Sequence, residues 1–163
     1  MKKDTSTLTK KITGYSSLAA SLLAISNLAS AQIVYTDVNP DVTDSGNGAA
    51  YDLDLNNDAT VDFRISITSN GAAAKLAAEA IGDNAIAGTY SDPYIYPSAL
   101  APGDMIGESK TWNSNIGGMT MASSGYFSGA YGEWFGATDK YLGLRIKVGT
   151  NEHYGWVRMD VTT

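Results

Sequence analysis

Short stretches in which apolar and polar residues alternate run through much of this chain, and Gly, Asn, Asp and Ser separate them. Residues 33–38, 51–55 and 61–68 have this pattern. Alternation with a period of two is typical of a strand with one buried face, and many short strands with turn residues between them indicate a sandwich or barrel. We therefore predict an all-β fold, a single-domain antiparallel β-sandwich or jelly-roll-like structure.

Two segments depart from the alternation. Residues 72–81 consist mostly of alanine, which has the highest helix propensity, so we predict one short helix there rather than a strand. Residues 88–132 are rich in Gly, Ser, Pro and aromatic side chains, which favours long loops with short strands over a linker between domains.

The clearest pair of strands covers residues 141–148 and 153–161, with a turn at residues 149–152. If Val148 lies opposite His153, period-2 geometry gives the hairpin one buried face. This register pairs the side chains of that face as Leu142 with Met159 and Leu144 with Val157.

The other face of this hairpin carries aromatic and cationic side chains. The same register places Tyr141 opposite Asp160, Arg145 opposite Trp156 and Lys147 opposite Tyr154. One interpretation is a ligand platform of Tyr141, Arg145, Tyr154 and Trp156, which would act through stacking and cation–π contact. The alternative is that these side chains only cover the outer face of a sheet, since cross-strand aromatic pairs are ordinary sheet stabilisers.

The segment DLNNDATVD at residues 54–62 places oxygen-bearing side chains at relative positions 1, 3, 5 and 9. Carboxylate, amide and carbonyl oxygens are the ligands that calcium prefers, and it accepts six to eight of them. The spacing therefore predicts a calcium site whose ligands are Asp54, Asn56, Asp58, the carbonyl of Thr60, and Asp62.

Related calcium loops limit this interpretation. The EF-hand and the dockerin repeat need an acidic ligand at position 12, which is Ile65 here, so neither motif fits. The pattern resembles the integrin-type β-hairpin calcium loop, whose last ligand is an aspartate at position 9, matched by Asp62. Position 6 is Ala59 where glycine usually makes the sharp turn. The alternative is an Asn/Asp turn that joins two strands without a metal.

The N-terminus has the three parts of a secretory signal. Four lysines within the first 11 residues precede a mostly apolar run over residues 18–28, and Ala29-Ser30-Ala31 gives a small-x-small cleavage site. The apolar run is shorter than the roughly 20 residues of a spanning helix. We expect cleavage before Gln32, which makes residues 1–31 the signal peptide and leaves residues 32–163 as one β-rich domain with no membrane span.

Charge and cysteine content exclude several function classes. The first 31 residues hold four of the eleven basic and one of the seventeen acidic residues, so the mature chain has a formal net charge of −9. Nucleic acid is therefore not an expected partner, because phosphate binding needs a Lys/Arg footprint. The chain has no cysteine, which excludes disulfides, thiolate nucleophiles and Cys-ligated zinc. A bound metal is one substitute cross-link for such a domain.

Five segments carry a resemblance to a known family: residues 31–40, 54–58, 84–88, 139–145 and 153–160. With these segments the chain resembles a family of uncharacterised secreted proteins of Bacteroidota type, which usually end in a type IX secretion sorting domain. The resemblance implies a location at the cell surface, in the periplasm or outside a Gram-negative cell. It implies no activity, because the family has no established one.

This chain departs from the family at its C-terminus. It ends at Thr163 with no further strand and no sorting tail, which suggests a truncated or partial gene product. A strand edge left beside the terminal hairpin would be a template for association, so self-association is expected.

Three functions follow from these features. The first is an exported, calcium-stabilised β-module with a structural or adhesive role and glycans or surface proteins as partners. The second is a carbohydrate-binding module that stacks sugars on Trp112, Tyr126, Tyr131, Trp134 or Trp156. The third is a secreted glycoside hydrolase, whose two carboxylates would come from Glu108, Glu133 and Asp139. We expect no enzyme, because the one histidine, His153, lies by a hairpin turn and no G-x-S-x-G elbow is present.

Overall fold

The computed structural model describes five stretches of chain: residues 41–70, 73–91, 93–114, 117–125 and 130–162. All nine strands of these stretches belong to the compact unit Thr43–Thr163. The predicted signal peptide and the predicted strand at residues 33–38 lie outside the described residues. Within the described stretches there is no helix with the length and apolarity that crossing a bilayer requires.

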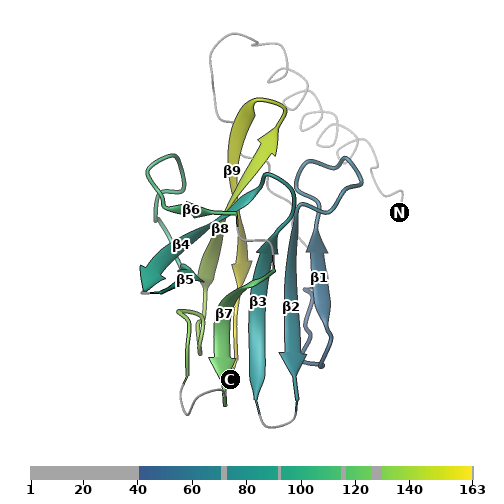
Figure 1. The fold of residues 1–163 in the computed structure, drawn as a ribbon, viewed down its shortest axis with the longest axis vertical. Coiled ribbons are helices and arrows are strands. Elements are labelled where there is room, and N and C mark those ends of the chain that lie inside the picture. The colour runs from purple at the N-terminus through teal and green to yellow at the C-terminus, as the bar shows by residue number, and fades with distance from the viewer. Residues whose placement is uncertain (1–40, 71–72, 92, 115–116, 126–129, 163) are drawn as a thin grey trace, which may run out of the picture. The chain divides into compact units, whose positions relative to one another are not determined.

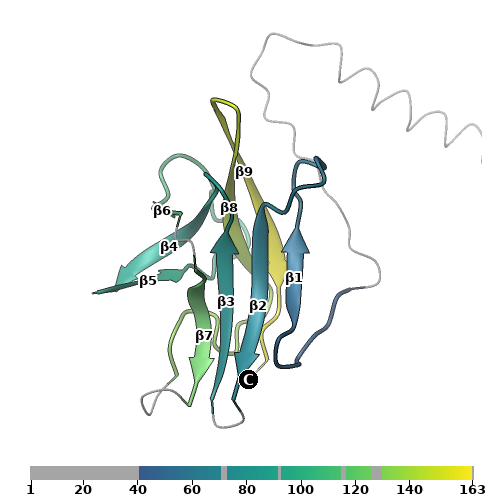
Figure 2. The same ribbon diagram turned by 45° about the vertical axis from the view of Figure 1, so that its right-hand side comes forward.

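The strands form two antiparallel sheets (Figure 1), which confirms the predicted all-β class and sandwich architecture. The first sheet has the order β1 (Ala50–Leu53), β2 (Phe63–Ser69), β3 (Ala74–Ala80) and β7 (Met119–Ser124). The second has the order β5 (Tyr94–Pro97), β4 (Ala85–Ser91), β8 (Lys140–Val148) and β9 (Asn151–Met159), with β6 (Trp112–Asn113) paired to β4. Figure 2 shows the first sheet in front of β8 and β9.

The hydrophobic core contains side chains from both sheets. Its fully buried large members are Phe63 of β2, Met121 of β7, Ile86 of β4, and Leu142 and Leu144 of β8. As the alternation predicts, the buried residues of one face recur at every second position over Phe63–Ile65 of β2 and Leu142–Ile146 of β8. A further member, Trp134, comes from the segment before β8, and its indole N–H donates to the carbonyl of Pro97 at 3.1 Å.

The helix predicted over residues 72–81 is wrong, because residues 74–80 form β3. This strand lies between β2 and β7 and is hydrogen-bonded to both, with a register shift between Leu76 and Ala77. Pairing on both sides satisfies the backbone as a helix would and also buries Ala78 and Ala80 in the core. The helix propensities of most residue types lie within about 1 kcal/mol of one another. Tertiary contacts such as these routinely override a preference of that size.

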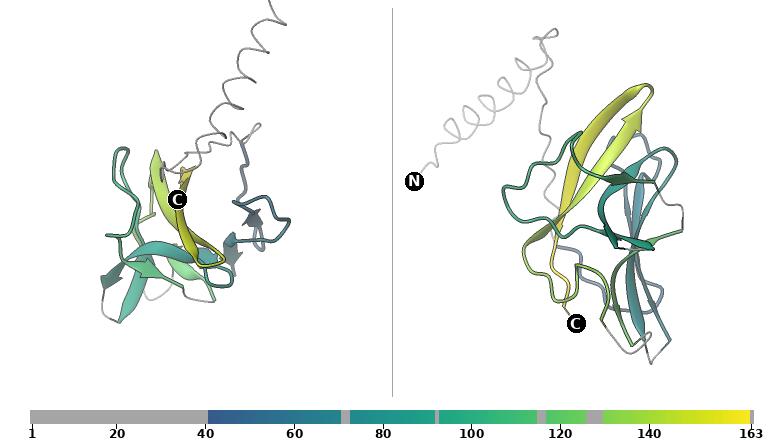
Figure 3. Two further views of the ribbon diagram at one scale, coloured as in Figure 1. Left: turned by 90° about the horizontal axis from the view of Figure 1, so that it is seen from above. Right: turned by 60° about the vertical axis from the view of Figure 1, so that its left-hand side comes forward.

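The hairpin of β8 and β9 is present (Figure 3), but its predicted register is wrong by two residues. Val148 pairs with Asn151 rather than with His153, so Leu142 lies opposite Val157. The connection is the two-residue turn Gly149-Thr150, in which Gly149 has a φ of 62°. This fits a type II′ turn, which takes glycine at its first central position. A shift of two residues keeps the same side chains on each face, so the predicted buried face is correct.

Candidate metal centre and ligand surfaces

The predicted calcium segment is the loop that joins β1 to β2. The main-chain N–H of Asp62 donates to the carbonyl of Leu53 at 2.7 Å and closes its base. Within the loop, Asn57 and Ala59 have left-handed φ values of 58° and 66°. Ala59 thus adopts the conformation that calcium loops usually assign to glycine, at a cost of about 1 kcal/mol.

The oxygens of the predicted ligands are held by main-chain N–H groups of the loop. Asp54 accepts from the N–H of Asp58 at 3.2 Å and of Ala59 at 2.9 Å. Asp58 accepts from the N–H of Thr60 at 2.8 Å, and Asn56 accepts from the N–H of Asp58 at 2.9 Å. A carboxylate oxygen has two lone pairs, so each retains capacity for a cation.

These contacts favour the ionised form of Asp58. The N–H of Thr60, followed by the side chain of Asn56, lowers the pKa of Asp58 below its ordinary value. A carboxyl with a lowered pKa adds stability above its unfolded-state pKa, and that stability is lost as the pH falls through the lowered value. Asp58 is therefore ionised and able to bind a cation at neutral pH.

Asp62 differs from the other predicted ligands because it is buried, with 6% of its surface exposed. One of its oxygens accepts from the N–H of Leu55 at 2.8 Å, and the other accepts from the side-chain amide of Asn84 at 3.1 Å. The amide oxygen of Asn84 accepts in turn from the N–H of Lys147 at 2.9 Å. Asn84 thus connects the loop to β8 in the second sheet.

The sequence reasoning did not identify this role of Asn84. A signal was present, since Asn84 directly precedes the apolar residues of β4, and a polar side chain beside a buried strand needs a partner. Among the described residues, no group of three or more His, Cys, Asp or Glu side chains is arranged to hold a metal ion. Calcium binding by this loop therefore stays a prediction.

The structure brings the four predicted platform residues to one face of the hairpin, but in different pairs from those predicted. Tyr141 meets Trp156 edge to face with ring centroids 5.2 Å apart. Tyr154 lies opposite Arg145 instead of Lys147, and its ring centroid is 5.3 Å from that of Trp112 in β6. The guanidinium of Arg145 lies 5.7 Å from the centroid of Trp112 and pairs with Glu152 at 3.2 Å.

These contacts make the platform a set of rings packed against one another. Tyr154 and Trp156 keep 37% and 36% of their surfaces exposed. Burial and the neighbouring Glu152 raise the pKa of Tyr154, so its phenol stays neutral. The arrangement can offer ring edges to a ligand, and it also covers the outer face of the sheet.

The other aromatic residues and the carboxylates that the sequence predicted as site residues lie away from this platform or outside the described residues. The prediction that Trp134 stacks a sugar is wrong, because this side chain is fully buried in the core. Tyr126 lies outside the described residues, and Tyr131 lines a surface hollow. Among the proposed catalytic carboxylates, Glu133 accepts from the N–H of Ala99 at 3.2 Å and Asp139 accepts from Arg158 at 2.6 Å. The charge of Glu108 acts on Tyr154 and is one of the smaller causes of the raised pKa of that phenol.

Comparisons with known proteins identified no relative of this chain. A scan of protein families, a search of curated proteins and a search of solved structures each found no match to this chain.

Proposed function

We propose that this protein is an exported, calcium-stabilised β-module with a structural or adhesive role at or outside the cell surface. The observation that carries the proposal is the loop at residues 54–62, in which Ala59 accepts left-handed backbone strain. Such strain persists where the surrounding structure imposes it, and in this loop the carboxylate of Asp54 accepts from the main-chain N–H groups of Asp58 and Ala59.

A bound calcium ion would give this domain a cross-link in place of a disulfide. The chain has no cysteine and therefore no disulfide to limit its unfolded state. Asp62 connects through Asn84 to β8, so a cation on this loop would stabilise contacts between the two sheets. The exported location rests on the signal-like residues 1–31 and on the family resemblance, and the adhesive role on β9, an edge strand of nine residues.

We predict that calcium raises the melting temperature of the mature protein and that Asp58→Ala abolishes the increase. A ligand that binds only the folded state adds about 2.7 kcal/mol at a hundredfold excess over its Kd. Thermal unfolding followed by circular dichroism, in calcium and in chelator, measures the effect. Asp44→Ala is a matched control, because Asp44 is also exposed and also accepts a main-chain N–H, that of Gly46, but lies outside the loop. Identical melting curves in calcium and chelator would refute the calcium part of the proposal.

The second candidate function is carbohydrate binding on the outer face of the β8–β9 hairpin. The exposed edges of Tyr154 and Trp156 favour it, since aromatic rings offer an apolar surface to sugars. In this case Trp156→Ala should weaken binding to an arrayed glycan by about tenfold, which corresponds to about 1.4 kcal/mol. Unchanged glycan binding by this variant would leave these rings with the role of covering the sheet.

A further inference from the structure

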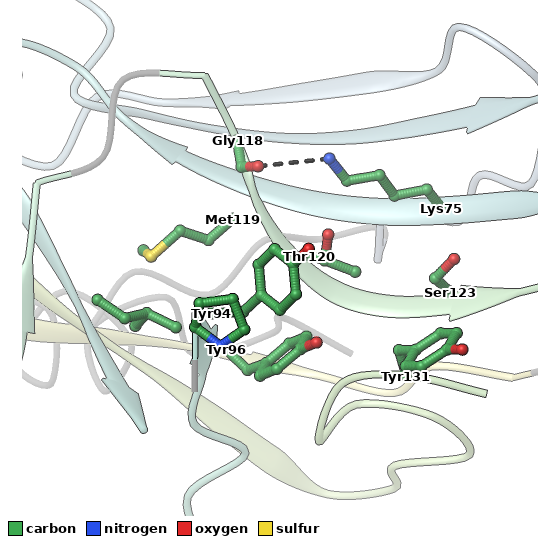
Figure 4. Close-up of a pocket in the computed structure, with 10 residues that line it drawn as sticks. Lys75, Tyr94, Tyr96, Gly118, Met119, Thr120, Ser123 and Tyr131 are labelled. Carbon is green, nitrogen blue, oxygen red and sulfur yellow. Dashed lines mark hydrogen bonds between the residues drawn. The ribbon is translucent and has the colours of Figure 1, made fainter. Parts of the chain in front are cut away.

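A hollow of about 460 Å³ lies between β7, an edge strand of the first sheet, and β5, an edge strand of the second (Figure 4). Its walls combine aromatic rings with hydroxyl groups and one ammonium group. The side chains that matter here are Tyr94 and Tyr96 of β5, Thr120 and Ser123 of β7, Tyr131, and Lys75 of β3.

A second hollow of about 480 Å³ adjoins the first. The two share Tyr96 and Tyr131, and the second adds Tyr90 of β4 and Glu133. The two hollows adjoin at these shared tyrosines, and we call them together the tyrosine groove. Four tyrosines line it: Tyr90, Tyr94, Tyr96 and Tyr131.

The groove is open to solvent and its rings have defined positions. Tyr90 and Tyr94 keep 61% and 63% of their surfaces exposed, the largest values among the exposed tyrosines of the described chain. Tyr94 and Tyr96 are two residues apart in an extended strand and therefore point to the same side. Their ring centroids are 6.4 Å apart and their planes differ by 59°.

The chemistry of the lining fits a polyhydroxylated ligand. Ligand pockets of about 300–1,000 Å³ are mostly apolar and aromatic, with a few polar groups that fix orientation. Here the polar groups are phenols and the hydroxyls of Thr120 and Ser123, each of which can donate and accept. Lys75 donates to the carbonyl of Gly118 at 3.4 Å, which leaves two of its three N–H donors for a ligand.

Sugars match such a lining, because they present apolar C–H faces to aromatic rings and hydroxyls to polar groups. The charge of the protein favours a neutral ligand, since the chain carries a formal net charge of −6 and repels polyanions. Two adjoining hollows favour at least two linked units over a single one. Among the described residues that line them, Glu133 is the one carboxylate, whereas glycoside cleavage needs a pair.

We propose that the tyrosine groove binds a neutral oligosaccharide without cleaving it, with Tyr94 and Tyr96 stacking on sugar faces. This site is separate from the calcium loop and from the outer face of the hairpin. It shares no residue with either, so it stands whether or not calcium binds.

The proposal is tested with the mature protein on an array of neutral oligosaccharides of glucose, xylose, mannose and N-acetylglucosamine, two to six units long, beside a matched set of uronic acid oligomers. The best neutral binder is then titrated by calorimetry against variants. We expect Tyr94→Ala to weaken binding of this oligosaccharide at least tenfold. Tyr94→Phe should retain most of the affinity, because stacking needs the aromatic ring and not the hydroxyl group of tyrosine. The monosaccharide should bind more weakly than the oligomer.

Phe135→Ala is the matched control, because it removes an exposed aromatic ring that lines neither hollow and belongs to neither of the other candidate sites. It should bind as the unchanged protein does. Thermal unfolding of each variant confirms that the fold is retained, which the exposure of Tyr94 favours. Binding of no neutral oligosaccharide, binding of the uronic acid set alone, or loss of binding in Phe135→Ala but not in Tyr94→Ala would each overturn the proposal.

Discussion

Leu142→Asp should leave the purified protein without a cooperative thermal transition. Leu142 of β8 is fully buried and belongs to the core cluster. An aspartate at this position would bury an unpaired carboxylate, which costs several kcal/mol, against a total stability of about 5–15 kcal/mol for a domain. Circular dichroism during heating measures the result.

Arg158→Ser provides the control for this substitution. Arg158 lies on the exposed face of β9 and its guanidinium pairs with Asp139 at 2.6 Å, which raises its pKa. The side chains are 60% and 49% exposed, and an ion pair at such a surface contributes about 0–1 kcal/mol. The variant should melt within a few degrees of the unchanged protein. A Leu142→Asp variant that melts at the same temperature would show that β8 does not contribute its predicted face to the core.

Gly132→Ala is expected to destabilise the protein by several kcal/mol, although it adds one methyl group. Gly132 has a φ of 89°, and a Cβ atom there would lie 2.0 Å from the carbonyl oxygen of Met121. That oxygen belongs to β7 and also accepts from the N–H of Trp134 at 3.1 Å, so the backbone cannot move aside without losing this bond. Denaturant unfolding measures the loss.

Gly136→Ala separates steric overlap from backbone strain. Gly136 also has a left-handed φ, 67°, but a Cβ atom there meets nothing within 4 Å. Its replacement should therefore cost only the conformational penalty of about 1 kcal/mol. Equal losses in the two variants would mean that the close approach of Gly132 to β7 does not limit the fold.

The strands that alternation identifies are those with one buried face. Phe63 and Ile65 of β2, and Leu142, Leu144 and Ile146 of β8, are apolar, buried and two residues apart, so the period of two predicts both the strand and its inner face. Alternation does not determine register, because a shift of two residues leaves both faces unchanged. The turn determines it, and the choice of Gly149-Thr150 over a longer turn depends on backbone geometry that a composition pattern does not contain.

The surface sites are harder to predict, because they combine residues that are distant in sequence. The loop at residues 54–62 is visible as a local motif, whereas the contact of Asp62 with Asn84 joins residues 22 apart. The tyrosine groove combines β3, β4, β5 and β7. Its local signal was the spacing of Tyr94 and Tyr96, two residues apart, which places both rings on one side of a strand.

The alanine-rich β3 has a consequence for the order in which the protein folds. Its partner β2 is the preceding strand, but its other partner, β7, begins 39 residues after β3 ends, with Ala74 paired to Ser124. Pairing two strands that are so far apart in sequence is slow compared with forming a local hairpin. Until β7 arrives, residues 74–80 retain their preference for helix and one of their edges has no strand beside it. The pairing of β3 with β7 should therefore limit the rate of refolding. The chain should be most prone to aggregate before this pairing is complete.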